Sequence, residues 1–231
     1  APVTTIILNQ TSAIGTDFSA FNSRKYESVG YTLFGAVNYQ REYDVDDDQF
    51  TELPNTRAFA VAPKLIFYLG EKTSVTVGNS FSHQRRKGGD IIALRGRPSA
   101  THTYFEENRS LRNVSTANLN HEFAGGARLL AKQSLAFFTR ALSTPGFVFD
   151  GTQFNSYTDV SILNSVGKHA LVVGASVVHD RFRERTPGVV PPRDETRTYG
   201  GVFIQDTVDV TNKLSLEAGF RLDRAKDYGT F

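Results

Sequence analysis

An acidic run early in the chain has the residue types and spacing that could bind a cation. Asp44, Asp46 and Asp48 occupy the first three acidic positions of a calcium-binding loop. Gln49, however, stands where that loop requires glycine, and Asn55 stands where it requires a bidentate glutamate. The alternative is a solvated acidic loop. The sequence therefore predicts no metal site and leaves the binding of calcium to this run open.

A second group of charged residues, near the middle of the chain, could bind an anion. It combines four arginines with a tyrosine: Arg85, Arg86, Arg95, Arg97 and Tyr104. An arginine fork matches the paired oxygens of a carboxylate or a catecholate-like group, so we predict that these residues bind an anionic ligand such as a ferric chelate. The alternative is that they bind lipopolysaccharide phosphates or neighbouring carboxylates. The net charge of only +2, spread over interleaved signs, argues against nucleic acid as a ligand.

The remaining candidates for chemistry do not form a catalytic site. His179 and Asp180 could be a base with an orienting carboxylate, but neighbours in a strand point to opposite faces. His83, His102, His121 and His169 show no ligand spacing, and the absence of Cys excludes thiolate chemistry and cysteine metal sites. We therefore predict that the protein is not an enzyme and has no cofactor.

The elements that must position these residues are β-strands. The clearest is a hairpin over residues 199–223, in which Leu214, Leu216, Ala218, Phe220 and Leu222 alternate with polar residues or glycine. This period of two is expected when one face of a strand meets an apolar medium and the other a polar one. Its arms exceed the usual soluble strand of about 5–6 residues. Long alternating strands joined by short turns are typical of a membrane β-barrel.

About ten such segments follow one another along the chain. They cover residues 10–20, 28–43, 57–69, 74–86, 111–123, 127–140, 153–164, 169–182, 199–210 and 214–224. Pro63 falls inside the third segment, and proline is tolerable at a bulge but costly in the middle of a ladder.

The connections between the segments alternate strictly between short and long. The short ones are residues 22–27, 70–73, 124–126, 165–168 and 211–213; the long ones are residues 44–55, 87–110, 141–152 and 183–195. Outer-membrane barrels have short periplasmic turns and long extracellular loops. Residues 87–110 form the longest loop, and we expect it, rather than a strand or a turn, to determine ligand specificity.

The composition is consistent with a barrel. Hydrophobic residues make up 39% of the 231 residues, mean hydropathy is −0.31, and no run of about 20 apolar residues exists. A membrane barrel escapes that hydropathy test because half of each strand is polar. Aromatic residues make up 12% of the chain, as interfacial girdles would require. The alternative is a soluble β-sandwich.

These segments resemble TonB-dependent outer-membrane receptors, especially the Bacteroidetes-type ones. The hairpin carries the receptors' pattern of aromatic-x-x-x-Phe-x-Gln-Asp from Tyr199 to Asp206, then a turn, then Leu-x-Leu-x-x-Gly-x-Arg-x-Asp from Leu214 to Asp223. Residues 30–41 and 62–90 are also similar to these receptors, so we expect the resemblance to span the whole chain.

The resemblance implies import of a scarce nutrient, such as a ferric siderophore, cobalamin or an oligosaccharide, when the TonB complex pulls on a plug domain. It also implies a barrel of 22 strands, of which residues 1–231 would be one part, with the plug and the remaining strands outside this chain. The absence of Met and of a leader also predicts a mature or partial chain. An alternative function is a structural or adhesive outer-membrane barrel, a subunit of a larger assembly that imports nothing.

Two structural expectations follow for this all-β barrel segment in the bacterial outer membrane. The strands should be antiparallel neighbours in one curved sheet, with one face turned to lipid. We predict that this face includes Leu33, Phe67, Val77, Leu135, Val173 and Phe220. The sheet should not close on itself, and both edge strands should pair with strands outside the chain, because open edges in lipid leave backbone groups unsatisfied.

Overall fold

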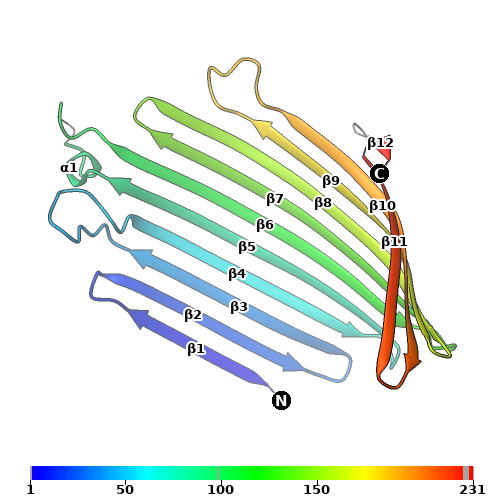
Figure 1. Cartoon of the computed structure of the whole chain (residues 1–231). Helices are drawn as coiled ribbons and strands as arrows, with labels where there is room; N and C mark the ends of the chain where they lie inside the picture. Colours follow the sequence, from blue (N-terminus) through cyan, green and yellow to red (C-terminus); the bar gives the residue numbers. More distant parts are fainter. Residues whose placement is uncertain (1, 98, 226–228, 231) are drawn as a thin grey trace.

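A single antiparallel β-sheet makes up almost all of the chain (Figure 1). The computed structural model describes residues 2–97, 99–225 and 229–230. The strands lie in chain order, each antiparallel to the next, with one short helix between two of them. Their bounds are β1 Val3–Gln10, β2 Gly15–Lys25, β3 Val29–Gln40, β4 Asn55–Tyr68, β5 Thr73–Gly89, α1 Ile91–Leu94, β6 Phe105–Glu122, β7 Arg128–Thr144, β8 Phe147–Val166, β9 His169–Glu184, β10 Glu195–Thr211, β11 Leu214–Ala225 and β12 Gly229–Thr230.

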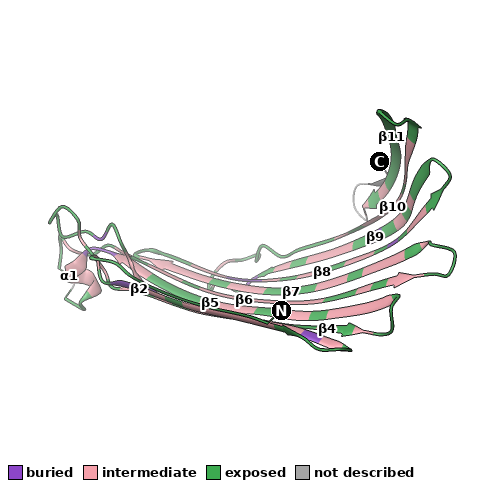
Figure 2. Ribbon diagram, turned by 90° about the horizontal axis from the view of Figure 1, so that it is seen from below, coloured by how far each residue is buried: buried purple, intermediate pink, exposed green. Residues whose placement is uncertain are grey.

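The sheet is curved and open (Figure 2). Each strand pairs with its neighbours in the sequence, and among the described residues β1 forms no ladder with β11 or β12. The predicted order and the predicted lack of closure are therefore confirmed. Among the described residues, none forms a helix with the length and hydrophobicity needed to span a membrane.

The ladder register separates the side chains into two faces. Leu33 lies opposite Pro63, and Phe67 opposite Val75, so the odd-numbered residues of β3, β4 and β5 share one face. Following the partners across β6 to β11 places the six predicted residues together on that side, which we call the apolar face: Leu33, Phe67, Val77, Leu135, Val173 and Phe220. All six side chains are exposed, Phe220 the most at 66%.

The opposite side of the sheet, which we call the polar face, carries the charged residues of the strand centres. Lys64, Lys132 and Asp159 lie on it, as do Glu217 and Arg221 of β11. No apolar residue of the described chain is buried, so the sheet has no core of its own. Covering a large apolar side chain contributes about 1.5–3 kcal/mol, and this sheet gains that only from an apolar medium on its apolar face.

The first predicted strand is wrong. Residues 10–20 do not form one strand: 11–14 form a turn, in which the N–H of Thr11 donates to the carbonyl of Gly15. Ile14 has φ 57°, a left-handed conformation that a β-branched residue rarely adopts. The turn was not predicted because isoleucine at this position is typical of a strand and not of a turn. The preceding strand β1 was not predicted at all.

The predicted loop over residues 141–152 is also wrong. Strands β7 and β8 continue through it, with Ser143 opposite Val148, and only Pro145 and Gly146 form the turn. Proline presets the first turn residue, and Gly146 supplies the positive φ of 79° that the second requires. Strict alternation of short and long connections therefore fails at this hairpin.

The loop predicted over residues 87–110 is shorter than expected. Strand β5 continues to Gly89 and β6 begins at Phe105, so the connection is reduced to residues 90–104, and its described part includes α1. Pro63 causes no bulge, because the register between β4 and β5 is the same on both sides of it.

The two ends of the sheet nevertheless differ as an outer-membrane barrel requires. At one end, the turn rim, every connection has at most five residues. At the other end, the loop rim, three long loops extend beyond the strands: residues 41–54, 90–104 and 185–194. Long loops lie on the extracellular side of such barrels, so we assign the loop rim to the outside.

The assignment of faces predicts opposite results for two neighbouring substitutions. Val173→Arg places a cation on the apolar face, which costs roughly 2–4 kcal/mol at the middle of a bilayer, whereas Val172→Arg places it on the polar face. In a membrane protein carrying this segment, the Val173 variant should assemble poorly and the Val172 variant normally. Heat-modifiable electrophoretic mobility measures assembly, and equal loss in both variants would contradict the assignment.

Candidate functional site at the loop rim

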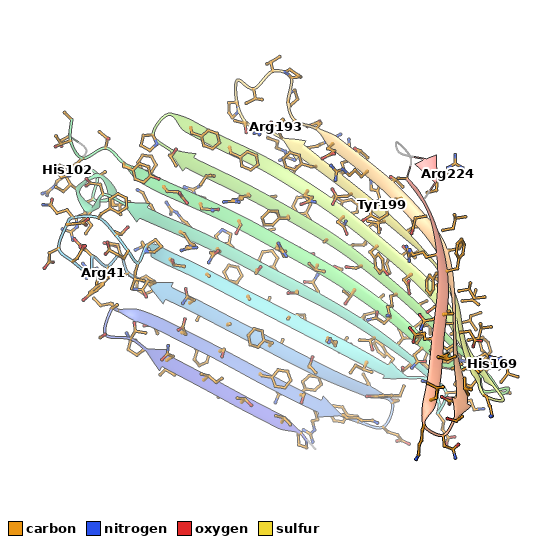
Figure 3. All side chains as sticks on the ribbon, viewed as in Figure 1. Arg41, His102, His169, Arg193, Tyr199 and Arg224 are labelled. Carbon is orange, nitrogen blue, oxygen red and sulfur yellow. The ribbon has the colours of Figure 1, made fainter. Side chains whose placement is uncertain are left out.

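The loop rim is built from two loops that bind each other's backbone. The N–H of Thr51 donates to the carbonyl of Gly89 at 3.0 Å, and the N–H of Ile91 donates to the carbonyl of Gln49 at 2.9 Å. The hydroxyl of Thr51 accepts from the N–H of Gly89 at 2.8 Å. Loops 41–54 and 90–104 therefore form one ordered surface. Arg41 and His102 both lie at this rim, close to α1 (Figure 3).

Asp90 holds the start of loop 90–104. Its Oδ1 accepts from the N–H groups of Ile92 at 2.8 Å and Ala93 at 3.2 Å, and its Oδ2 lies 2.5 Å from Nδ1 of His102. Burial alone would raise the pKa of Asp90. The hydrogen bonds from His102 and from the two backbone groups outweigh that effect, so the pKa lies below its usual value.

The structure separates Arg85 from Arg86. Because they are neighbours in β5, Arg85 lies on the apolar face, opposite Arg57 and Arg109, whereas Arg86 lies on the polar face, opposite Thr56. Both arginines fall inside the predicted strand over residues 74–86, so the alternation of side chains along a strand already implies this separation, although the two residues were grouped in one candidate site.

Arg86 and Tyr104 line the same cavity. The cavity has a volume of about 380 Å³ and lies where the loop-rim ends of β5 and β6 meet loop 41–54. Its walls are Phe50, Thr51, Pro54, Arg86, Gly88, Gly89, Tyr104, Glu106 and Asn108. The ring of Tyr104 stacks on that of Phe50, with centroids 5.8 Å apart. A cation beside two aromatic rings is a site for a flat anionic group.

The two loop arginines project from the end of α1. Arg95 is the C-cap residue, and its N–H donates to the carbonyl of Ile91, while the N–H of Arg97 donates to that of Ile92. The side chain of Arg97 is exposed. These backbone bonds fix the turn independently of the guanidinium groups. Arg95 and Arg97 thus lie at the C-terminal end of α1, and no contact links them to Tyr104.

The acidic run forms the one group of three or more potential metal ligands in the described chain. Asp44, Asp46 and Asp48 are joined by Glu52, and one carboxylate oxygen of each lies within 4.8 Å of the others. Oδ1 of Asp44 is enclosed without a hydrogen-bond partner, while its Oδ2 accepts from the N–H of Gln49. Gln49 adopts φ 72°, the conformation that glycine supplies in a calcium loop. Glu52 was not predicted from the sequence, because it does not occupy a ligand position in the spacing of a calcium-binding loop.

The histidines are dispersed. His179 lies on the apolar face and contacts the hydroxyl of Thr198 at 2.8 Å, whereas Asp180 on the polar face accepts from Gln153 at 2.7 Å. These two residues therefore do not pair, which agrees with the prediction from their adjacent positions in a strand. His169 lies at the turn rim, 2.7 Å from Asp206 (Figure 3).

The third loop, residues 185–194, is held to the ends of β8 and β9 by an ion pair and by hydrogen bonds to Asp150 and Glu184. Arg193 donates to the carboxylate of Glu184 from Nε and Nη2, both at 2.7 Å, and from its backbone N–H at 3.0 Å. The carboxylate is fully covered, and it raises the pKa of Arg193. The Arg193 guanidinium also lies over the ring of Phe149 on β8, 5.9 Å from its centroid. The loop is therefore tied to the end of the sheet.

Solved structures of outer-membrane receptors share this fold. A mutant of the ferric enterobactin receptor of Pseudomonas aeruginosa superposes with a TM-score of 0.69 at 13% identity, covering 100% of this chain and 40% of the receptor. The siderophore receptor PirA of the same species gives 0.67 at 16%, covering 100% and 37%. The ferric-catecholate import receptor Fiu of Escherichia coli K12 gives 0.72 at 11%, covering 97% and 44%.

This chain thus spans less than half the length of the solved receptors it matches. No curated protein matches it. The resemblance to Bacteroidetes-type receptors in particular stays a prediction, because none of these matches bears on it. The family model "TonB dependent receptor-like, beta-barrel" matches residues 5–231. The chain, an all-β barrel segment, therefore belongs to the TonB-dependent receptor family, whose members are outer-membrane receptors of Gram-negative bacteria and not enzymes.

Proposed function

We propose that this chain is part of the wall of an outer-membrane receptor that imports a scarce, anionic nutrient such as a ferric siderophore. The observation that carries the proposal is the family match over residues 5–231. The arrangement of the rim supports it, because an arginine and stacked aromatic rings line a cavity at the loop end of the polar face. The siderophore receptors of similar fold give the class of ligand.

The rest of the machinery lies outside residues 1–231 in this proposal. A plug domain would fill the barrel and couple it to the TonB complex, and further strands would pair with β1 and with the edge beyond β11. The share of the solved receptors that this chain covers, between 37% and 44%, leaves room for both. Lipid and lipopolysaccharide would cover the apolar face.

The residues predicted to bind the ligand have different roles in this proposal. Arg86 and Tyr104 bind the ligand in the rim cavity, and Arg95 and Arg97 meet it first from the loop above. Arg85 belongs to the same prediction, but its side chain lies on the apolar face, where a ligand moving through the barrel interior would not pass.

Removing the loop guanidinium groups tests the proposal. Arg95→Ala together with Arg97→Ala in the full receptor should weaken binding of an anionic ferric chelate by about tenfold or more, because each charge-assisted hydrogen bond contributes strongly to binding. Assembly should be unchanged, since the turn depends on backbone bonds. Equilibrium binding to whole cells measures the affinity. Unchanged affinity and uptake would require the ligand site to lie elsewhere.

The carboxylate of Asp90 should control the order of the same loop. Since its pKa is lowered in the folded protein, its contribution is complete above the unfolded value of about 3.9 and is lost as pH falls through the lower folded value. Asp90→Asn should therefore increase amide hydrogen exchange of residues 91–95 at pH 7, and the exchange free energy of the variant should change less than that of wild type between pH 5 and pH 3. Wild-type exchange in the variant at pH 7 would refute this role. Glu106→Gln, on the neighbouring strand, is the control.

A further inference from the structure

A row of arginines crosses the apolar face at the loop rim. Arg57 of β4, Arg85 of β5 and Arg109 of β6 are direct partners in the ladder, each opposite the next. Like charges directly opposite one another destabilise a sheet unless an anion lies between them. All three arginines are exposed residues. The three guanidinium groups therefore repel one another, and a negatively charged partner would relieve that repulsion.

The acidic residues of the chain only partly supply that partner. Glu107 accepts from Nε of Arg85 at 2.8 Å and from Nε of Arg109 at 2.5 Å, so one carboxylate serves two arginines. Arg57 and Lys87 contact aromatic rings, those of Tyr39 at 5.9 Å and of Phe105 at 5.6 Å. Within the described part of the chain, neither has a carboxylate within ion-pair distance. The group keeps an excess of positive charge.

A hollow of about 260 Å³ lies among these side chains. Its walls are Glu42, Asn55, Arg57, Arg85, Lys87 and Leu94. The single carboxylate in it, that of Glu42, is partly covered, which would raise its pKa. The amide of Asn55, together with the charges of Arg41 and Arg95, outweighs that effect and lowers the pKa. The field in the hollow therefore favours negative charge.

The position of the arginine row along the strands indicates which kind of anion it meets. Going outward along the apolar face, aliphatic residues such as Leu65 and Val77 come first. Phe59 follows, with its ring 5.6 Å from that of Phe81 and 5.9 Å from that of His83. The arginine row is the next step. An apolar band bordered by aromatic residues is the signature of the hydrocarbon region and its interface, so the row stands at the height of the lipid headgroups.

We propose that Arg57, Arg85, Lys87 and Arg109 bind the phosphate groups of a phosphorylated glycolipid of the outer leaflet. Arginine forks bind two phosphate oxygens at once, and Lys87 adds a point charge beside them. The site cannot serve a ligand inside the barrel, because it lies on the opposite face of the sheet from Arg86. The proposal requires only a barrel in the outer membrane, and it is independent of the imported nutrient.

The test compares two triple variants of the full receptor that lose the same charge from opposite faces. One is Arg57→Gln, Arg85→Gln and Arg109→Gln on the apolar face; the control is Lys64→Gln, Lys132→Gln and Arg140→Gln, all exposed residues of the polar face. Purified receptors in detergent are titrated with bis-phosphorylated lipid A and with its dephosphorylated form. Heat-modifiable mobility shows that each variant is assembled.

Wild type and control should bind the phosphorylated lipid about tenfold more tightly than the dephosphorylated one, and the apolar-face variant should lose that preference. Retention of the preference in that variant, or equal loss in the control, would overturn the site. Binding of inorganic phosphate alone as tightly as the phosphorylated lipid would overturn the assignment to a lipid, leaving a simple anion site. Uptake of nutrient is not a readout here, so failure of the proposed function leaves this result unaffected.

Discussion

The structure depends on one constraint: a sheet of a single layer offers each side chain only two environments. Without a second sheet or helices packed against it, the apolar face can be covered only by an apolar medium, and no apolar residue of the described chain is buried. The same sheet leaves backbone groups open at β1 and beyond β11, which in lipid would cost several kcal/mol each. Both requirements are met in a closed barrel that crosses a membrane, which is the fold of the family.

The sequence predicted what this constraint imposes and missed what turn chemistry decides. The alternation of β9, β10 and β11 places Val173 and Phe220 unambiguously, since a shift of one residue would turn every apolar side chain to the wrong face. By contrast, Pro145 and Gly146 were interpreted as part of a loop although they form a tight turn, and the turn before Gly15 was hidden by a β-branched residue with positive φ. The candidate site was predicted as a set of residues, but the cavity that joins Arg86 and Tyr104 depends on the contacts between loops 41–54 and 90–104, which the pattern of the strands does not specify.

The hairpin that carries the family resemblance has a physical basis in the structure. The ring of Phe203 covers Gly174 on the neighbouring strand, where an added Cβ would lie 2.5 Å from a ring carbon. On the other side the guanidinium of Arg221 lies 5.8 Å from the ring centroid and donates to Asp223 and, at 3.0 Å, to the hydroxyl of Ser176. The phenylalanine and arginine positions of the motif, together with Gly174 of β9, thus hold three strands in one register on the polar face.

Polar residues inside the apolar face show what the membrane environment selects. Asn79 donates to Ser115 at 2.9 Å and exchanges hydrogen bonds with Asn113 at 3.2 Å, and two strands away Gln133 donates to Ser156 at 3.2 Å. These side chains interrupt the apolar pattern, yet each has a partner on the adjacent strand. Lipid penalises an unsatisfied polar group far more than a paired one. Strict alternation of apolar and polar residues along a strand is therefore not required. A polar residue that faces lipid is tolerated where the register of the ladder places it opposite a second polar residue. The sequence of a single strand does not show which residues are opposite each other.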